Sequence, residues 1–512
     1  MNNSPSERMR CAAFATLSLI ALSATAGDWR DKVDPALRAE LAKSAGAPVR
    51  VLIVPQVDDK ARVDIAALSA RTPPKLRPQV VHAALRAQAA ATQAGVIGWL
   101  RREGVEYQAF SVVNAVAATL PPSRLDLLAK RKDVVRIDAD PVIRHALPKA
   151  EPLPLGKAVT AIELGVTYIN APAVWALPGN PRGTGIVVAG QDTGYRWTHA
   201  ALKAKYRGWN GVSANHDYQW HDAIHSGGGV CGANAVAPCD DNGHGTHTMG
   251  TMIGDDGGTN QIGVAPDAKW IACRNMDVGN GTPTTYLECF EFFLAPYPVG
   301  GTPAQGDPNQ APHVINNSWG CPAVEGCNSG NWATMQTAIS NLTAAGVLVV
   351  VSAGNGGSGC STVSDPPAFF AESFSVGNFS ASTGTLSGSS SRGPVTVDGS
   401  NRMKPDISAP GSSVRSAVNS GDTSYTTMSG TSMAGPHVAG AAALFMSAVP
   451  ALQRQPALVR QYLEQSATAV SSTACSSAGV PNNLYGHGRL DVLAAVQAAL
   501  VVYPHLFADG FE

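Results

Sequence analysis

Hydrophobic runs and the polar residues between them divide the chain into two regions whose predicted elements follow different orders. In the first region, the branched apolar run at residues 49–54 predicts a strand, and the alanine-rich stretch at residues 80–102 predicts a helix. The other elements predicted there are strands at residues 105–110, 112–119 and 134–137 and a short helix at residues 121–131. This β-α-β-β-α-β order is typical of a small ferredoxin-like α+β domain.

The second region alternates strands that are apolar almost throughout with helical segments. A parallel sheet that is buried on both faces produces runs of this kind, so we expect one α/β domain over residues 158–500. Pro148, Pro152 and Pro154 separate the two regions and predict an exposed linker at residues 147–157. The predicted strands of the α/β domain are residues 185–190, 270–274, 313–316, 346–352 and 374–376.

The first residues have the layout of a signal peptide. Arg8 and Arg10 precede an apolar run at residues 11–22, and Ala24-Thr25-Ala26 then offers a small-residue cleavage site. We therefore expect a signal peptide at residues 1–26 and a secreted, extracellular mature chain. Later apolar stretches are broken before the roughly 20 residues that a membrane span needs, so we expect no membrane partner. Residues 501–512 form a short C-terminal tail whose role the sequence leaves open.

The charge balance excludes classes of partner that are recognised through bulk charge. Lysine and arginine number 37 against 38 aspartates and glutamates, and the formal net charge is −1. A protein that binds nucleic acid or acidic membranes through its overall charge carries a basic excess, which is absent here. We therefore expect no nucleic-acid partner.

Cysteine usage fits an oxidising compartment. Cys11 lies in the signal segment, so eight of the nine cysteines remain in the mature chain. An even set in a secreted protein suggests disulfides, although their connectivity cannot be deduced from sequence. The alternative is that some of these cysteines are free buried thiols. The short gaps in the sequence suggest the local pairs Cys231–Cys239 and Cys321–Cys327. The cysteines that remain would then pair as Cys273–Cys289 and Cys360–Cys475.

Two motifs place an acid and a base where regular elements end or begin. Asp192-Thr193-Gly194 ends an apolar strand, where an acid can orient a base, although an aspartate at such a position is more often a turn or cap residue. His244 and His247 lie three apart among small residues. Because the His-Glu-x-x-His pattern of zinc peptidases is absent, one general base is favoured over two metal ligands.

The third motif contains a serine at a predicted helix start. Ser432 lies within Met428–His437 of the sequence, directly before a long run of small and apolar residues. Unpaired N–H groups and the positive end of the helix dipole can stabilise an oxyanion that forms beside such a serine. The alternative is an ordinary helix-capping serine. Each motif alone is weak, but their order, Asp then His then Ser, is the order of subtilisin.

On these motifs the chain resembles the subtilase family of serine peptidases, family S8. Segments 263–266, 404–411 and 485–491 are also family-like, so the resemblance spans about residues 158–498. Segment 316–321 and the cysteine-bearing insertion around Asp240 are similar to secreted members of the bacillopeptidase F type. The resemblance implies a subtilisin-like three-layer α/β domain with a mostly parallel central sheet. It also implies a serine endopeptidase with the triad Asp192, His244 and Ser432.

The resemblance also implies the residues around the triad. Asn355 matches the family's side-chain donor to the oxyanion. Asp365 lies where the family closes the pocket, and it would favour a basic residue if it pointed inward, but before two prolines we favour a surface turn. The residues expected to bind substrate, in a mode like strand addition, are Ser318, Trp319, Gly320, Ala353 and Gly354.

The small first domain resembles the inhibitor-type propeptide of subtilases. Residues 27–146 would then assist folding and occupy the active site as an intramolecular inhibitor. Self-cleavage would release them at a position within about residues 140–160, which includes the linker at residues 147–157. The other partners implied are protein or peptide substrates, and we expect a monomer.

The resemblance implies no cofactor for the chemistry, whereas a structural calcium ion is common in the family. Here residues 259–262 are too short for the family's calcium loop, so the metal site stays unknown. Asp255 and Asp256 offer oxygen ligands of the kind that calcium takes. A cluster of His216, His221 and His225 offers metal ligands as well, but a solvated loop is favoured.

Two other classes of function compete with the peptidase. One is a catalytically silent, subtilase-like binding protein, which the presence of the triad and of Asn355 disfavours. The other is an α/β-hydrolase esterase, because residues 430–434 nearly match its nucleophile motif. That fold needs its acid and then its histidine after the serine. Here Asp406 and His244 precede Ser432, and His437 and His487 lack a suitable context.

Overall fold

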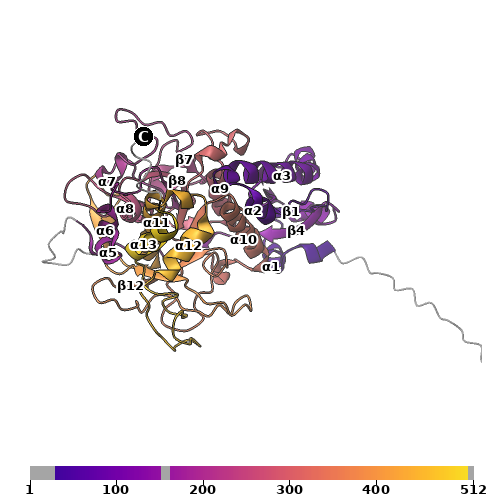
Figure 1. The fold of residues 1–512 in the computed structure, drawn as a ribbon. Helices are drawn as coiled ribbons and strands as arrows, with labels where there is room; N and C mark the ends of the chain where they lie inside the picture. The colour runs from indigo at the N-terminus through magenta and orange to yellow at the C-terminus, as the bar shows by residue number, and fades with distance from the viewer. Residues whose placement is uncertain (1–28, 152–161, 505–512) are drawn as a thin grey trace, which may run out of the picture.

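The computed structural model describes residues 29–151 and 162–504. The predicted signal peptide, residues 152–157 of the predicted linker and the end of the C-terminal tail lie outside the described residues. Figure 1 shows a smaller N-terminal part, coloured indigo to violet, beside a larger part that contains the rest of the described chain. Within residues 29–151 and 162–504, no helix is long and apolar enough to cross a membrane.

The N-terminal part contains an antiparallel four-stranded sheet. Its elements are α1 (Pro35–Lys43), β1 (Val49–Pro55), α2 (Ile65–Arg71), α3 (Arg77–Arg102), β2 (Tyr107–Phe110), β3 (Ala115–Leu120), α4 (Pro122–Ala129) and β4 (Val134–Ala139). The strand order is β2-β3-β1-β4. Val51, Ile53 and Val116 pack with apolar side chains of α3 and α4, which therefore cover one face of the sheet. The arrangement agrees with the predicted ferredoxin-like unit.

One predicted strand in this part is shorter than expected. The apolar run at residues 112–119 predicts a strand from its first residue, but β3 begins only at Ala115. Residues 111–114 form a turn instead. The N–H groups of Ser111 and Val112 bind the carboxylate of Glu291, 3.0 and 2.6 Å away, rather than a neighbouring strand. The hydrogen bonds to Glu291, in the larger part of the molecule, therefore override the local preference of residues 111–114 for a strand.

The larger part is built on a seven-stranded parallel sheet. Its strands are β6 (Val187–Asp192), β7 (Trp220–Asp222), β8 (Lys269–Arg274), β10 (Val314–Asn317), β11 (Leu348–Ser352), β12 (Phe374–Phe379) and β13 (Ile407–Pro410). Their order is β13-β12-β11-β10-β6-β8-β7, and every pairing is parallel. The five predicted strands are all present. β7 and β13 were not predicted, because they are short edge strands without a long apolar run.

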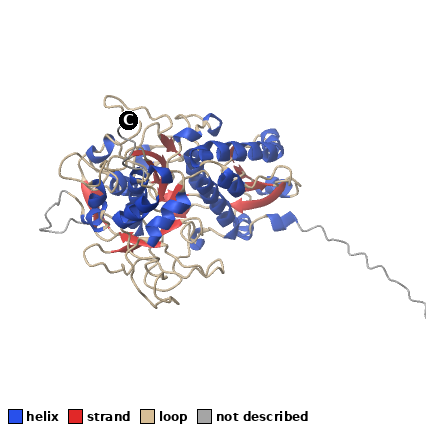
Figure 2. Cartoon of the chain, viewed as in Figure 1, coloured by secondary structure: helices blue, strands red, loops and turns tan. Residues whose placement is uncertain are grey.

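Helices cover both faces of this sheet and complete three layers (Figure 2). The helices of the larger part are α5 (Leu164–Tyr168), α6 (Ala171–Trp175), α7 (Ala200–Lys203), α8 (His244–Ile253), α9 (Pro283–Leu294), α10 (Ser329–Ala344), α11 (Thr431–Ala448), α12 (Pro456–Gln465) and α13 (Val492–Val502). Val188 and Val314 pack with the apolar residues of α8 and α11. Ala189 and Ile315, one position along, pack with α9 and α10 on the opposite face. This alternation confirms the α/β domain with a parallel sheet buried on both faces that the apolar runs predicted.

Polar contacts and a shared apolar cluster join the two parts. Leu52 and Ala117, on the open face of the N-terminal sheet, belong to the same buried cluster as the apolar side chains of α9 and α10. The Asn341 amide donates to the Val112 carbonyl over 2.8 Å. Glu291 is buried at this junction, and its burial raises the pKa of the carboxyl group. The N-terminal part is therefore docked on the two helices that cover one face of the large sheet.

All four predicted disulfides are present in the structure. Each pair has a Cα–Cα distance between 5.2 and 5.7 Å, which lies in the usual range for disulfides. The pairs are Cys231–Cys239, Cys273–Cys289, Cys321–Cys327 and Cys360–Cys475. The alternative of free buried thiols is therefore wrong for these eight cysteines.

Candidate active site

Asp192 is held at the carboxyl end of the central strand β6 and faces His244. The Nδ1 atom of His244 lies 2.8 and 3.0 Å from the two carboxylate oxygens of Asp192. Both side chains are buried. Gly194, with φ +111°, lets the chain turn directly after Asp192, and a Cβ atom there would lie 1.8 Å from the Cys239 carbonyl oxygen. A glycine is therefore required at this position of the Asp-Thr-Gly motif, because the loop that contains Cys239 lies too close to the Gly194 backbone for a side chain.

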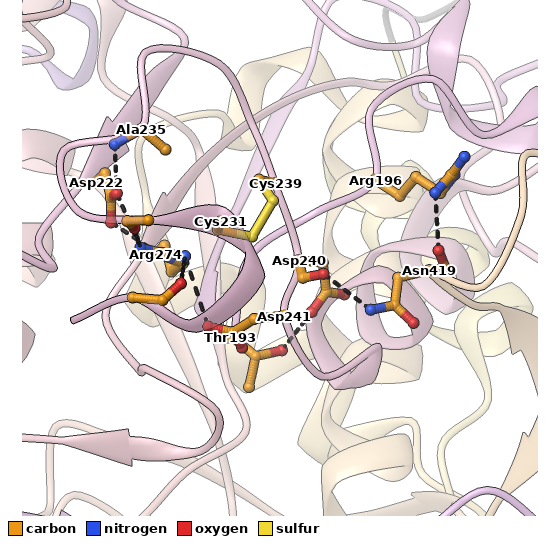
Figure 3. Close-up of a disulfide and its surroundings, with 12 residues drawn as sticks. Thr193, Arg196, Asp222, Cys231, Ala235, Cys239, Asp240, Asp241, Arg274 and Asn419 are labelled. Atoms are coloured by element: carbon orange, nitrogen blue, oxygen red, sulfur yellow. Dashed lines mark hydrogen bonds and ion pairs between the residues drawn. A yellow bond between two sulfur atoms is a disulfide. The ribbon is translucent and has the colours of Figure 1, made fainter.

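His244 is the first residue of α8, and Asp240 holds the loop that leads into it. The Asp240 carboxylate accepts hydrogen bonds from the N–H groups of Gly243 and Thr246, at 2.8 and 3.0 Å. It also accepts from the Thr193 hydroxyl at 2.9 Å, which ties the loop after β6 to the start of α8 (Figure 3). This role of Asp240 was not predicted from the sequence. The available signal was an acid shortly before a helix start, where unpaired N–H groups need an acceptor.

Ser432 lies in the first turn of α11, two residues after Gly430. The Ser318 hydroxyl donates to the Ser432 carbonyl over 3.0 Å, and the Ser432 Oγ atom lies 3.4 Å from the Ser318 carbonyl oxygen. The Nε2 atom of His244 has no hydrogen-bond partner among the described residues. His145 links the two residues: it lines the cavity that contains Ser432, and the charge of His244 is close enough to affect its pKa. Among the described residues Ser432 and His244 make no direct hydrogen bond, a contact that often tightens only when substrate binds.

The amide of Asn355 is oriented by the residue before Ser432. Its Oδ1 atom accepts from the N–H and the hydroxyl of Thr431, at 2.9 and 3.0 Å. With the oxygen engaged in this way, the Nδ2 atom is left to serve as a donor. Asn355 and Ser432 line one cavity, so this donor is available to an oxygen atom that is bound beside Ser432.

Residues 143–148 of the N-terminal part cross this site as an added strand. β5 (Ile143–Arg144) pairs antiparallel with β9 (Asn280–Gly281), and the His145 N–H continues the ladder to the Gly279 carbonyl at 3.0 Å. Burial lowers the pKa of His145 to about 4, and the charges of Asp192 and His244 are close enough to affect it. The site thus holds an extended peptide by strand addition, the mode expected for a substrate.

A model of the subtilase family matches residues 183–488, which contain all the site residues placed on the large sheet. The chain belongs to the subtilase family. It is 39% identical over 352 residues to bacillopeptidase F of Bacillus subtilis (strain 168), a match that covers 67% of this chain but only 22% of that protein. It is 30% identical over 380 residues to an alkaline protease of Alkalihalobacillus alcalophilus, covering 74% of this chain and 80% of that one. Over 338 residues, or 66% of its length, it is 30% identical to 99% of subtilisin Savinase of Lederbergia lenta.

All five residues expected to bind substrate line the cavity beside Ser432, which measures about 270 Å³. Trp319 forms a fixed wall because it stacks on Tyr286, with ring centroids 4.0 Å apart. Asp365, for which we favoured a surface turn, lies in a bend that lines the same cavity, and its side chain is part-buried. The five lining residues are Ser318, Trp319, Gly320, Ala353 and Gly354.

The histidines considered as metal ligands do not form one cluster in this subtilase. His216 lies 2.9 Å from the Tyr206 hydroxyl, whereas His221 and His225 both contact Glu288, at 2.6 and 2.9 Å. Burial acts to raise the pKa of Glu288, but the hydrogen bonds from the two histidines outweigh it and hold this pKa at about 2. The bond to Glu288 in turn raises the pKa of His225 to about 9.

The acids considered for calcium are occupied by protein donors. Asp255 pairs with Arg182 at 3.3 Å and accepts the Gly257 N–H at 2.9 Å. Asp256 accepts the N–H of Gly258 at 2.8 Å and the Asn260 side-chain amide at 2.6 Å. Across the described part of the chain, no group of three or more acids, histidines or cysteines is placed to hold a metal ion. We therefore assign no calcium site to these residues.

His247, the second histidine of the His244 motif, is a buried structural residue. Its Nε2 atom lies 3.0 Å from the Val414 carbonyl oxygen, and its burial lowers the pKa to about 3. An imidazole with that pKa stays neutral at physiological pH. This contact with the backbone supports the prediction of a single general base in the motif.

Proposed function

We propose that this subtilase is a secreted serine endopeptidase that is made as a zymogen and cleaves itself. The observation that supports the proposal is that one extended segment of the chain spans both the Asp192–His244 pair and the cavity lined by Ser432 and Asn355. A binding protein would need the cavity but not an acid, a base, a nucleophile and an oxyanion donor together.

The arrangement supports acyl transfer through Ser432. A neutral serine is a poor nucleophile, so His244 takes the Ser432 proton at its unpartnered Nε2 atom as the oxygen attacks the peptide carbonyl. Asp192 holds the other ring nitrogen in its protonated form and stabilises the imidazolium cation. The negative oxygen is stabilised by the Asn355 amide and the Ser432 N–H. His244 then protonates the leaving amine, and water hydrolyses the acyl-enzyme.

The segment that crosses the site supports self-cleavage after Ala146. His145 lies within electrostatic range of Asp192 and His244. Pro148 packs against the backbone of Gly430, two residues before Ser432. The Ala146–Leu147 bond lies between these two anchors, and both residues line the cavity that contains Ser432. Residues 27–146 would then be the released propeptide, docked until release through Glu291 and the apolar cluster on α9 and α10.

Export is supported by the signal-peptide pattern at residues 1–26 and by the four disulfides. Disulfides persist in oxidising compartments and are rare in the cytosol of mesophiles. The proposed substrates are proteins or peptides that can present an extended segment to the site. Self-cleavage would leave the propeptide as an inhibitor until it is removed.

The experiment that tests the proposal combines labelling with mapping of the new N-terminus. Purified full-length protein is incubated with casein, with and without a sulfonyl fluoride, and followed by intact mass and N-terminal sequencing. We expect casein cleavage that the reagent abolishes, a single adduct on the Ser432 peptide, and a mature chain that begins at Leu147. No casein cleavage and no adduct would leave the catalytically silent binding protein as the better description.

The oxyanion donor gives a prediction of intermediate size. Changing Asn355 to alanine removes one of two donors to the negative oxygen, which exists only during reaction. We expect kcat on a peptide substrate to fall about 10²- to 10³-fold with KM nearly unchanged, a size measured on subtilisin, a member of this family. Steady-state kinetics of the mature variant give both constants. The control is Asn210→Ala in an exposed turn, and a loss confined to KM would contradict the assigned role.

A further inference from the structure

The cavity beside Ser432 contains two carboxylates that play no part in the proposed acyl transfer. Asp365 and Glu325 both line it, on opposite loops, together with Ser432 and the Ala146 of the crossing segment. Asp365 faces Gly320, where an added Cβ atom would lie 3.5 Å from the Cβ atom of Asp365. The rest of the wall includes small side chains such as Ala353 and Ala368. The cavity is therefore partly apolar, with one carboxylate on each of two loops.

Both loops that present these acids are held in place. Glu325 ends a short 3₁₀ turn inside the loop that the Cys321–Cys327 disulfide closes. The Cys321 N–H donates to the Pro366 carbonyl over 2.8 Å, which ties this loop to the one that contains Asp365. The positions of the two carboxylates are thus fixed by covalent and backbone contacts rather than by ion pairs.

Neither acid has a cationic side chain as a partner among the described residues. Asp365 accepts a hydrogen bond from the neighbouring Ser364 hydroxyl at 3.3 Å, and Glu325 accepts the backbone N–H of Arg144. Burial raises the pKa of Asp365, and the charge of Glu325 raises it further. Two part-buried acids that repel each other are unfavourable unless a positive group joins them.

We propose that this cavity selects a lysine or arginine side chain of the substrate, with Asp365 as the main determinant and Glu325 as the second. The proposal rests on the proposed peptidase function and names its substrate class. A long basic side chain lays its methylene groups along the small apolar residues and brings its charge to the two acids. The residue selected is the one whose carbonyl Ser432 attacks. With the proposed cut after Ala146, that residue takes the place of Ala146, one of the segment residues that line the cavity.

The alanine at position 146 is compatible with this selectivity. Self-cleavage is intramolecular, because the pairing of β5 with β9 holds the segment in place. The effective concentration of the segment is therefore high even without contacts from the Ala146 side chain. A free substrate has no such advantage and depends on the cavity. The alanine before the self-cleavage bond therefore does not determine which residue is preferred in substrates in solution.

The test compares matched peptides that differ only in the residue before the scissile bond. We expect mature wild-type protein to cleave the lysine and arginine peptides with a kcat/KM at least 10-fold above that for leucine. Asp365→Asn should lower kcat/KM about 10- to 100-fold for lysine but less than threefold for leucine, as for loss of one partner of a part-buried ion pair. Glu325→Gln should lower kcat/KM by a smaller factor, again more for lysine than for leucine. If Asp365→Asn does not fold, the Glu325 variant provides the test.

The control is Glu372→Gln, an acid outside the cavity that contacts Gln336, which should leave the lysine-to-leucine ratio unchanged. A wild-type preference for leucine, or equal losses on both peptides in the Asp365 variant, overturns the selectivity and leaves the peptidase intact. A wild-type protein that cleaves no peptide and no casein overturns the peptidase function itself.

Discussion

Ser432→Ala protein should keep residues 27–146 attached and show no measurable hydrolysis of casein. The variant retains the cavity, Asn355 and the Asp192–His244 pair but has no atom that can form the acyl-enzyme. In subtilisin, a member of this family, loss of the nucleophile lowers kcat about 10⁶-fold. Because the same serine is proposed to cut the chain's own segment, processing and peptidase activity should be lost together. Intact mass over time and a casein assay measure the two.

The matched control is Ser447→Ala, on the same helix α11, where the hydroxyl bonds to the Leu444 carbonyl at 2.7 Å. This variant should be processed and active. If Ser432→Ala protein lost residues 27–146 as fast as wild type, self-cleavage would be excluded even if casein hydrolysis failed. The peptidase and zymogen claims are thereby separated.

Asp192→Asn should reduce both self-cleavage and peptide hydrolysis about 10⁴-fold at neutral pH. The asparagine amide cannot accept the Nδ1–H of His244 at both positions that the carboxylate now offers, at 2.8 and 3.0 Å. The imidazole is then held in the wrong tautomer, and its cation loses a buried counter-charge. Triads of this kind lose about this factor when the acid is neutralised. Single-turnover release of residues 27–146 and steady-state kcat give two independent measurements.

The control for this change is Asp217→Asn, in a loop of the larger part, where the carboxylate accepts the Val299 N–H at 3.0 Å. It should have nearly wild-type rates. A kcat above one tenth of the wild-type value in Asp192→Asn protein would mean that the His244 imidazole is oriented by something else. Asp240, which organises the start of α8, would be the next residue to replace.

The residues proposed for the triad could be selected from the sequence because Asp192 and Ser432 each adjoin an element with a strong local signal. Asp192 ends a strand of apolar residues, and Ser432 begins a helix of small and apolar residues. The order of the motifs along the chain then separated the family from an α/β-hydrolase. Strands buried on both faces were similarly visible, since every residue of β10, β11 and β12 is buried.

Features that depend on contacts between distant segments could not be predicted. Asp240 joins Thr193 to α8 only because the fold brings the two loops together. The pairing of β5 with β9 involves two-residue strands, too short for any periodic pattern. Asp365 before two prolines has the composition of an exposed turn, and only the opposing loop closed by Cys321–Cys327 makes it part of a cavity.

The Cys360–Cys475 disulfide would hold the chain together if the proposed peptidase cut a second copy of itself. It joins residues 115 apart, and the enclosed stretch contains Ser432 and all of α11. An exposed bond within that stretch, near Ser400, is accessible to a neighbouring molecule. After such a nick the two fragments stay covalently linked, so the nucleophile is not shed from the body that contains His244. Damage of this kind would appear as two bands only after reduction, while the unreduced molecule migrates as one piece.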